Sequence, residues 1–101
     1  MKSKLVRDNI PAIIRESGKT PVVHSAKTDV EARAVTIAKM YEEVSEFEEA
    51  PSLEEAADIY QVFMALLTTH NLKFDDVIKT AAHKNAQRGR FDKMIVLDDV
   101  L

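Results

Sequence analysis

Acidic side chains are concentrated in one short stretch of the sequence, between Glu42 and Asp58. The stretch contains eight of them and no basic residue: Glu42, Glu43, Glu46, Glu48, Glu49, Glu54, Glu55 and Asp58. Carboxylates at this density repel one another unless they are solvated or a counter-charge is bound. This stretch is therefore the first candidate for a functional site.

Two pairs within the stretch have a spacing that puts both members on one side of a helix. Glu43 and Glu46 are three residues apart, as are Glu55 and Asp58, and Pro51 lies between the pairs. A short turn at Pro51 makes the flanking helices antiparallel neighbours. At about 1.5 Å of rise per residue, the two pairs then lie at matching heights. We therefore expect the four carboxylates to converge.

A hard divalent cation would balance such a cluster, because Mg²⁺ prefers oxygen ligands and shares its coordination with substrate phosphates. The chain has no cysteine, which excludes thiolate sites. The position of Glu55 favours a metal site over a solvated face, since Ile59, Val62 and Leu66 follow it on the same side of its helix. The spacing equally allows a solvated acidic face, with Glu55 as the third residue of a capping box.

Three cationic side chains are candidates for binding phosphate. Lys84 and Arg88 are four residues apart in the last predicted helix, and Arg7 lies near the N-terminus with Lys4. Arginine offers a two-pronged donor to phosphate oxygens, and lysine offers a point charge. For Lys84 and Arg88, the favourable position of a cation at a helix C-terminus is the simpler explanation.

The apolar periodicity predicts an all-α fold, a helical bundle of about four helices built on an antiparallel helix hairpin. Asp8 is expected to cap a first short helix that Gly18 ends. Ser52 is expected to cap the third helix, which ends near residue 70, and the fourth is expected over about 74–88.

The second helix is expected over 29–49, and its apolar stripe is predicted to be buried. The stripe consists of Val30, Ala34, Ile37, Tyr41 and Val44. Two further segments, 21–25 and 93–97, are rich in β-branched or aliphatic residues and are predicted as a possible small pair of β-strands.

The composition limits the class of protein. At 101 residues the chain is expected to form one domain, 1–101. A net charge of −3 argues against a nucleic-acid-binding protein, and the longest apolar run is too short to span a membrane. No secretory leader is recognisable at the N-terminus, so a cytoplasmic location is expected.

The acidic stretch resembles a family signature. Residues 42–46 and 55–58 are similar to the E-E-x-x-E and E-x-x-D motifs of the all-α nucleoside triphosphate pyrophosphohydrolases, the MazG-like superfamily. Residues 4–11 resemble the K-L-V-R-D-K-I-P opening of a small single-domain branch, and residues 84–91 resemble its K-x-x-x-R-G-G-F element. These matches cover nearly the whole chain in the expected order. Asn9 stands where the branch commonly has lysine, and Arg90 stands where it has the second glycine.

The resemblance implies a Mg²⁺-dependent enzyme, with Mn²⁺ as a possible substitute, that converts a nucleoside triphosphate to the monophosphate and pyrophosphate. A non-standard or deoxyribonucleoside triphosphate is the expected substrate, and a homodimer or higher homo-oligomer the expected assembly. The resemblance further implies that Glu43, Glu46, Glu55 and Asp58 bind the metal and that Lys84, Arg88 and Arg7 bind phosphate. Glu42 or Glu46 is expected to activate water.

Two other interpretations stay open at this point. The substrate could be phosphoribosyl-ATP or another pyrophosphate-linked compound, because a metal site of this kind recognises the phosphates and not the base. In a different class, the chain could be a non-catalytic helical dimerisation module on the same scaffold.

Overall fold

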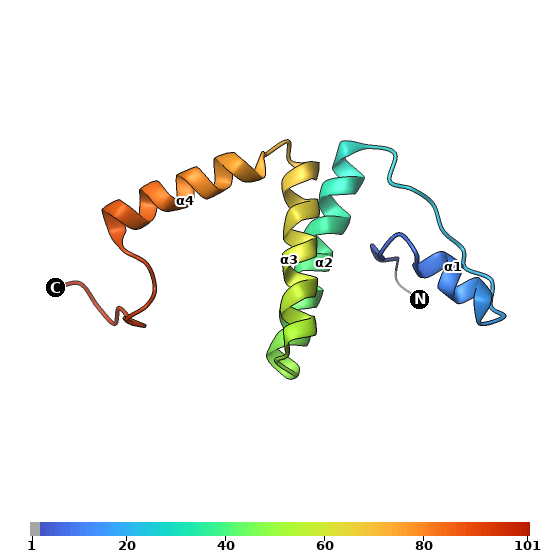
Figure 1. The fold of residues 1–101 in the computed structure, drawn as a ribbon, viewed down its shortest axis with the longest axis horizontal. Helices are drawn as coiled ribbons and strands as arrows, with labels where there is room; N and C mark the ends of the chain where they lie inside the picture. Colours follow the sequence, from blue (N-terminus) through green and yellow to red (C-terminus); the bar gives the residue numbers. More distant parts are fainter. Residues whose placement is uncertain (1–2) are drawn as a thin grey trace. The chain divides into compact units, whose positions relative to one another are not determined.

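The computed structural model describes residues 3–101, and over these residues the protein is all-α with no β-strand (Figure 1). Its helices are α1 (Ile10–Glu16), α2 (Asp29–Glu49), α3 (Leu53–Thr69) and α4 (Phe74–Arg88). The chain divides into two compact units, Met1–Asn71 and Leu72–Leu101. The first unit contains the packed hairpin of α2 and α3 that the sequence predicts, and all of the acidic stretch.

Side-chain caps define where each helix of this hairpin begins. The α2 helix begins after Thr28, whose hydroxyl oxygen accepts a hydrogen bond from the backbone N–H of Glu31. The α3 helix begins after Ser52, whose Oγ accepts from the backbone N–H of Glu55 at 3.1 Å. Each cap satisfies a donor that the first turn of a helix otherwise leaves unpaired. The Ser52 cap thereby also fixes where α3 starts relative to Glu55.

Removing the Ser52 cap should destabilise the hairpin. We expect Ser52→Ala to lower the free energy of unfolding by about 1 kcal/mol, the usual cost of losing an N-cap hydroxyl. Ser52→Asp keeps an acceptor at the cap and serves as the control, with stability close to that of the wild type. Urea unfolding followed by circular dichroism measures both. Equal stability of the alanine and aspartate variants would show that the cap contributes little.

The α2 helix packs against α3 through a face that the sequence does not predict. Its buried residues are Thr36 and Glu43, and those of α3 are Val62 and Leu67. The Thr36 hydroxyl donates to backbone carbonyls of α2 and lies 3.2 Å from the hydroxyl of Thr69 on α3. The inward side of α2 thus carries two fully buried polar residues with half-buried Ala32, Met40 and Phe47 between and beside them, and it is not the predicted apolar stripe.

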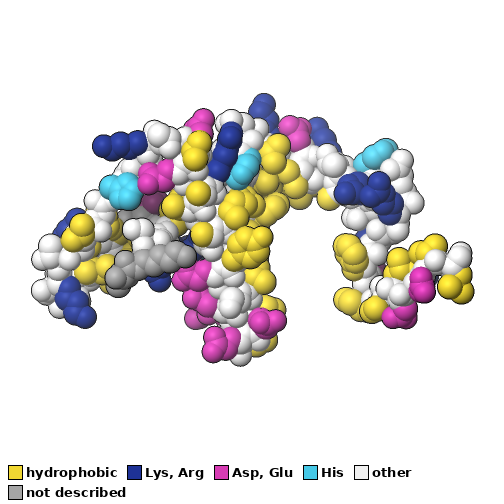
Figure 2. All heavy atoms as spheres, turned by 180° about the vertical axis from the view of Figure 1, so that it is seen from behind, with side chains coloured by type: hydrophobic (Ala, Val, Ile, Leu, Met, Phe, Trp, Pro, Cys, Tyr) yellow, Lys and Arg dark blue, Asp and Glu magenta, His cyan; other side chains and the backbone are white. Residues whose placement is uncertain are grey.

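Within the first unit, the prediction that the apolar stripe of α2 is buried is wrong. Val30 is 78% exposed, Tyr41 75%, Val44 50% and Ile37 40%. Figure 2 shows hydrophobic side chains along one edge of the hairpin and acidic side chains on the other. Periodicity identifies a stripe that prefers burial, but it does not say which surface covers it.

Two local predictions also need correction. The α1 helix is preceded by Asn9 rather than Asp8 as its N-cap, and no side-chain hydrogen bond caps it. The proposed strand pair is absent from the described residues, because neither 21–25 nor 93–97 is paired with another segment as a strand. Val22 and Ile95 are 97% and 82% exposed, so β-branched side chains there lack the packing partners that a strand needs.

The α4 helix forms most of the second unit. Asp75 and Asp76 lie in its first turn, where the helix dipole favours negative charge, and Gly89 ends it with a positive φ of 84°. Over the described residues, no helix has the combined length and apolar character needed to cross a membrane.

Candidate metal centre

The hairpin brings the predicted carboxylates together. Glu43, Glu55 and Asp58 each place one carboxylate oxygen within 4.8 Å of the others. Glu42, Glu43 and Glu46 form a second group with the same limiting distance. Glu43 belongs to both groups, so it lies at the centre of one continuous acidic cluster. The antiparallel arrangement expected from the spacing of the two pairs is thus present.

Two oxygens in this cluster have no protein partner. Glu43 is only 4% exposed, and its Oε2 atom is buried without a hydrogen bond; the Oε2 atom of Glu55 is in the same situation. Leaving a buried acceptor unpaired costs about 1–3 kcal/mol, and more when it is charged. A bound divalent cation would remove this cost by taking both oxygens as ligands. The donor set, all carboxylate, fits Mg²⁺ or Mn²⁺.

Lys39 is part of this cluster, although it is not among the residues predicted from the sequence. Its Nζ lies 3.2 Å from Oε1 of Glu43 and 3.3 Å from Oε2 of Glu42, and its side chain is only 15% exposed. Burial alone would lower the pKa of Lys39, but Glu43 and Glu42 raise it above its ordinary value. The ammonium group therefore stays charged and holds one oxygen of Glu43 while leaving the other free. Lys39 lies three residues before Glu42 and four before Glu43, a spacing that brings side chains together on a helix. This spacing is the signal in the sequence that indicates the contact.

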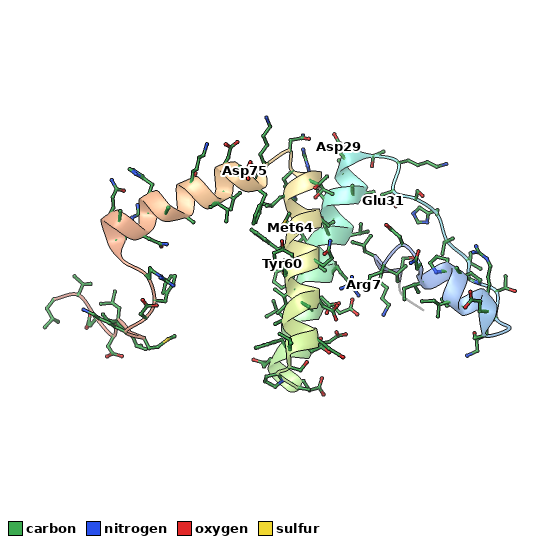
Figure 3. The ribbon with its side chains drawn as sticks, viewed as in Figure 1. Arg7, Asp29, Glu31, Tyr60, Met64 and Asp75 are labelled. Atoms are coloured by element: carbon green, nitrogen blue, oxygen red, sulfur yellow. The ribbon has the colours of Figure 1, made fainter. Side chains whose placement is uncertain are left out.

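Arg7 approaches the cluster from the N-terminal segment. Its Nη2 atom donates to Oδ1 of Asp58 at 2.6 Å, and Nζ of Lys4 lies 3.5 Å from Oε1 of Glu42. Figure 3 shows Arg7 beside the hairpin, with Tyr60 on the other side of α3. The predicted phosphate ligand Arg7 is thus already paired with a predicted metal ligand.

A cavity of about 320 Å³ separates this segment from the hairpin. Residues 5–8 line one side of it, and Lys39, Glu43, Asp58 and Val62 are among the residues on the other. The cavity is therefore bounded by cationic, acidic and apolar side chains, as a site for a charged ligand with an apolar part requires.

Lys84 and Arg88 lie four residues apart on α4, in the second unit, and both are exposed. A helix spacing of four puts them on one side of α4, as predicted. Their assignment as phosphate ligands stays a prediction.

The two glutamates predicted to activate water differ in their surroundings. The charge of Glu43, followed by burial, raises the pKa of Glu46 above its ordinary value. Burial also acts to raise the pKa of Glu42, but Lys39 and Lys4 lower it overall. A base that is held by two lysines accepts a proton less readily. Glu46 is therefore the better candidate for a general base.

The raised pKa of Glu46 predicts a pH dependence of stability in metal-free buffer. Because its folded pKa lies above the ordinary value of 4.5, its contribution to stability is fully present below that value and is lost as pH rises through the folded pKa. We expect Glu46→Gln to melt at a higher temperature than the wild type at neutral pH, and this gain to disappear below pH 4.5. Melting curves across pH with a chelator measure the effect.

Glu48→Gln is the control for this experiment, since Glu48 is exposed on the same helix and outside both carboxylate groups. It should show no such gain. A gain for Glu46→Gln that persists below pH 4.5 would mean that charge repulsion is not its cause.

Comparison with known proteins adds a relative of unknown activity. No family model matches the chain, and no solved structure matches it. An uncharacterized protein of Mycolicibacterium smegmatis is 43% identical over 56 residues. The match covers 55% of this chain and 56% of that protein, so the chain spans little more than half the length of this relative.

Proposed function

We propose that this protein hydrolyses a nucleoside triphosphate to the monophosphate and pyrophosphate in a Mg²⁺-dependent reaction. The observation that carries the proposal is the pair of buried, unpartnered oxygens on Glu43 and Glu55 within a carboxylate cluster. The order of the three resembling motifs along the chain gives independent support. A non-standard or deoxyribonucleoside triphosphate from the cytoplasmic pool is the proposed substrate.

Glu43, Glu46, Glu55 and Asp58 are the residues that would hold the metal. When bound, Mg²⁺ would neutralise phosphate charge and lower the pKa of water. Glu46 would accept the proton of the water that attacks the α-phosphorus, and the bond to the bridging oxygen would break to release pyrophosphate. Lys39 would keep the Glu43 carboxylate oriented throughout. Arg7, Lys84 and Arg88 would stabilise negative charge on the phosphates.

We also propose that the active form is a homodimer. The exposed stripe of α2 supports this, because four large apolar or aromatic side chains on one helix face are costly to leave in water. Over the described residues, the buried apolar side chains are Val62 and Leu67, and both belong to the first unit, so the core within that unit is very small. A second copy that covers the stripe would enlarge this core and add walls to the substrate site.

Product analysis tests the proposed reaction. The purified protein is incubated with a panel of ribo- and deoxyribonucleoside triphosphates and Mg²⁺, and the products are separated by ion-exchange chromatography. We expect monophosphate and pyrophosphate, and none of either when a chelator is present. Diphosphate and inorganic phosphate would overturn the proposal.

Two further results would redirect it. If the protein turned over phosphoribosyl-ATP but no triphosphate on the panel, the proposed substrate would change and the proposed site of bond cleavage would stand. Absence of turnover, together with a melting temperature that does not respond to Mg²⁺ or Mn²⁺, would favour the non-catalytic dimerisation module, since a ligand of the native state must stabilise it.

A further inference from the structure

The ion pair between Arg7 and Asp58 joins two residues 51 positions apart and occupies an oxygen of the acidic cluster. Asp58 thereby differs from Glu43 and Glu55, each of which has a buried oxygen without a partner. The cluster is thus partly neutralised by the protein itself: Lys39 binds the Glu42 and Glu43 side, and Arg7 binds the Asp58 side.

These two cations are held very differently. The Lys39 side chain is 15% exposed and contacts two carboxylates from within its own helix. The Arg7 side chain is 59% exposed and belongs to a segment, residues 3–7, that forms no helix or strand. An exposed ion pair of this kind contributes little free energy, so its replacement by another ligand of Asp58 costs little. Lys39 is built into the cluster, whereas Arg7 can be exchanged.

We propose that Arg7 is an exchangeable counter-ion: it neutralises Asp58 in the metal-free protein and is displaced from Asp58 when a divalent cation binds the cluster. The displaced guanidinium remains at the wall of the 320 Å³ cavity. There it binds a phosphate oxygen of the nucleotide, for which its two-pronged donor geometry is well suited. This inference rests on the proposed metal-dependent function, and it makes metal binding a condition for presenting Arg7 to the substrate.

The exchange predicts opposite effects of one substitution on two ligands. Without Arg7, a divalent cation no longer competes for Asp58, so Arg7→Gln should bind Mn²⁺ about two- to fivefold more tightly than the wild type in the absence of nucleotide. The same variant loses a phosphate ligand. In the presence of saturating Mn²⁺, it should bind a non-hydrolysable nucleoside triphosphate about tenfold more weakly.

Isothermal titration calorimetry measures both affinities without any requirement for turnover. Arg15→Gln is the matched control, because it removes the same charge from exposed α1, and Arg15 has no ion pair within residues 3–101. Its Mn²⁺ and nucleotide affinities should equal those of the wild type. Arg7→Lys keeps the charge but loses the two-pronged guanidinium donor. Compared with Arg7→Gln, it should return the Mn²⁺ affinity to near the wild-type value and restore the nucleotide affinity only in part.

The outcomes separate this inference from the proposed function. Wild-type protein that binds Mn²⁺ with the same affinity as Arg7→Gln, or more tightly, would overturn the exchange and leave the metal-dependent function standing. Failure of all variants to bind Mn²⁺, with circular dichroism showing that each is helical, would overturn both.

Discussion

Replacing Glu55 by Gln should reduce kcat by at least about a hundredfold while leaving the protein at least as stable as the wild type in metal-free buffer. The Oε2 atom of Glu55 is buried and has no hydrogen-bond partner in the protein. Removing the charge of Glu55 relieves repulsion from Glu43 but weakens the proposed metal site. A metal ion contributes several kcal/mol to transition-state stabilisation, which corresponds to this loss in rate. Initial rates with Mg²⁺ and thermal melting give the two quantities.

Glu54→Gln is a closely matched control. It makes the same chemical change one residue earlier in α3, at an exposed position outside both carboxylate groups. It should retain nearly full activity. If Glu55→Gln also retained nearly full activity, Glu55 could not be a metal ligand, and Asp58 would be the one ligand that α3 supplies to the proposed centre.

Asp58→Asn should abolish turnover as well, but with a different effect on stability. Asp58 is paired with Arg7 in the metal-free protein, so its neutralisation removes an ion pair as well as a repulsive charge. We therefore expect no gain in melting temperature for Asp58→Asn, in contrast to Glu55→Gln. This difference distinguishes a carboxylate that the protein neutralises from one that it leaves unpaired.

The carboxylate cluster could be predicted from sequence because it depends on local rules. The spacing of three in each pair sets the face, and Pro51 and the Ser52 cap set the turn and the start of α3. These features act within about one helical turn of each residue. For that reason the meeting of Glu43 with Glu55 and Asp58 follows from the sequence alone.

The contacts of the N-terminal segment could not be predicted in the same way. Arg7 and Asp58 are separated by 51 residues, and no periodic pattern links them. Lys39 was within reach of a local rule, but a lysine three or four residues before glutamates is common on solvated helices. Only its burial beside Glu43 distinguishes it.

The inward face of α2 was predicted wrongly for a physical reason. Its apolar stripe is the face expected to be buried, yet the fully buried residues of α2 are Thr36 and Glu43, with Met40 and Phe47 half-buried beside them. A helix that buries polar side chains among its apolar ones gains less hydrophobic stabilisation on that side. In the proposed function, Glu43 on the inward side binds the metal, and the apolar stripe remains available for a second copy. The exposure of the stripe is thus both the reason that the prediction was wrong and the observation that supports the proposed dimer.

Introducing charge into the stripe should dissociate the proposed dimer. In a symmetric interface, the double substitution Tyr41→Glu and Val44→Glu removes four side chains from apolar contact, two from each copy. At about 1.5 kcal/mol or more for each buried side chain, the dissociation constant should increase by about ten-thousandfold or more. Sedimentation velocity over a concentration series measures this change. Because the second copy is proposed to add walls to the substrate site, turnover should fall together with the dimer fraction.

Ala12→Glu separates this effect from a general effect of added acid. Ala12 is exposed on α1 and lies outside α2 and its stripe, so its substitution should leave the dimer intact. The double variant should also bind Mn²⁺ in the cluster of each monomer, because Glu43, Glu55 and Asp58 are all supplied by one chain. Retained metal binding with lost turnover would show that the dimer completes the substrate site and not the metal centre. A wild-type protein that sediments as an active monomer would instead require the exposed stripe to have another function.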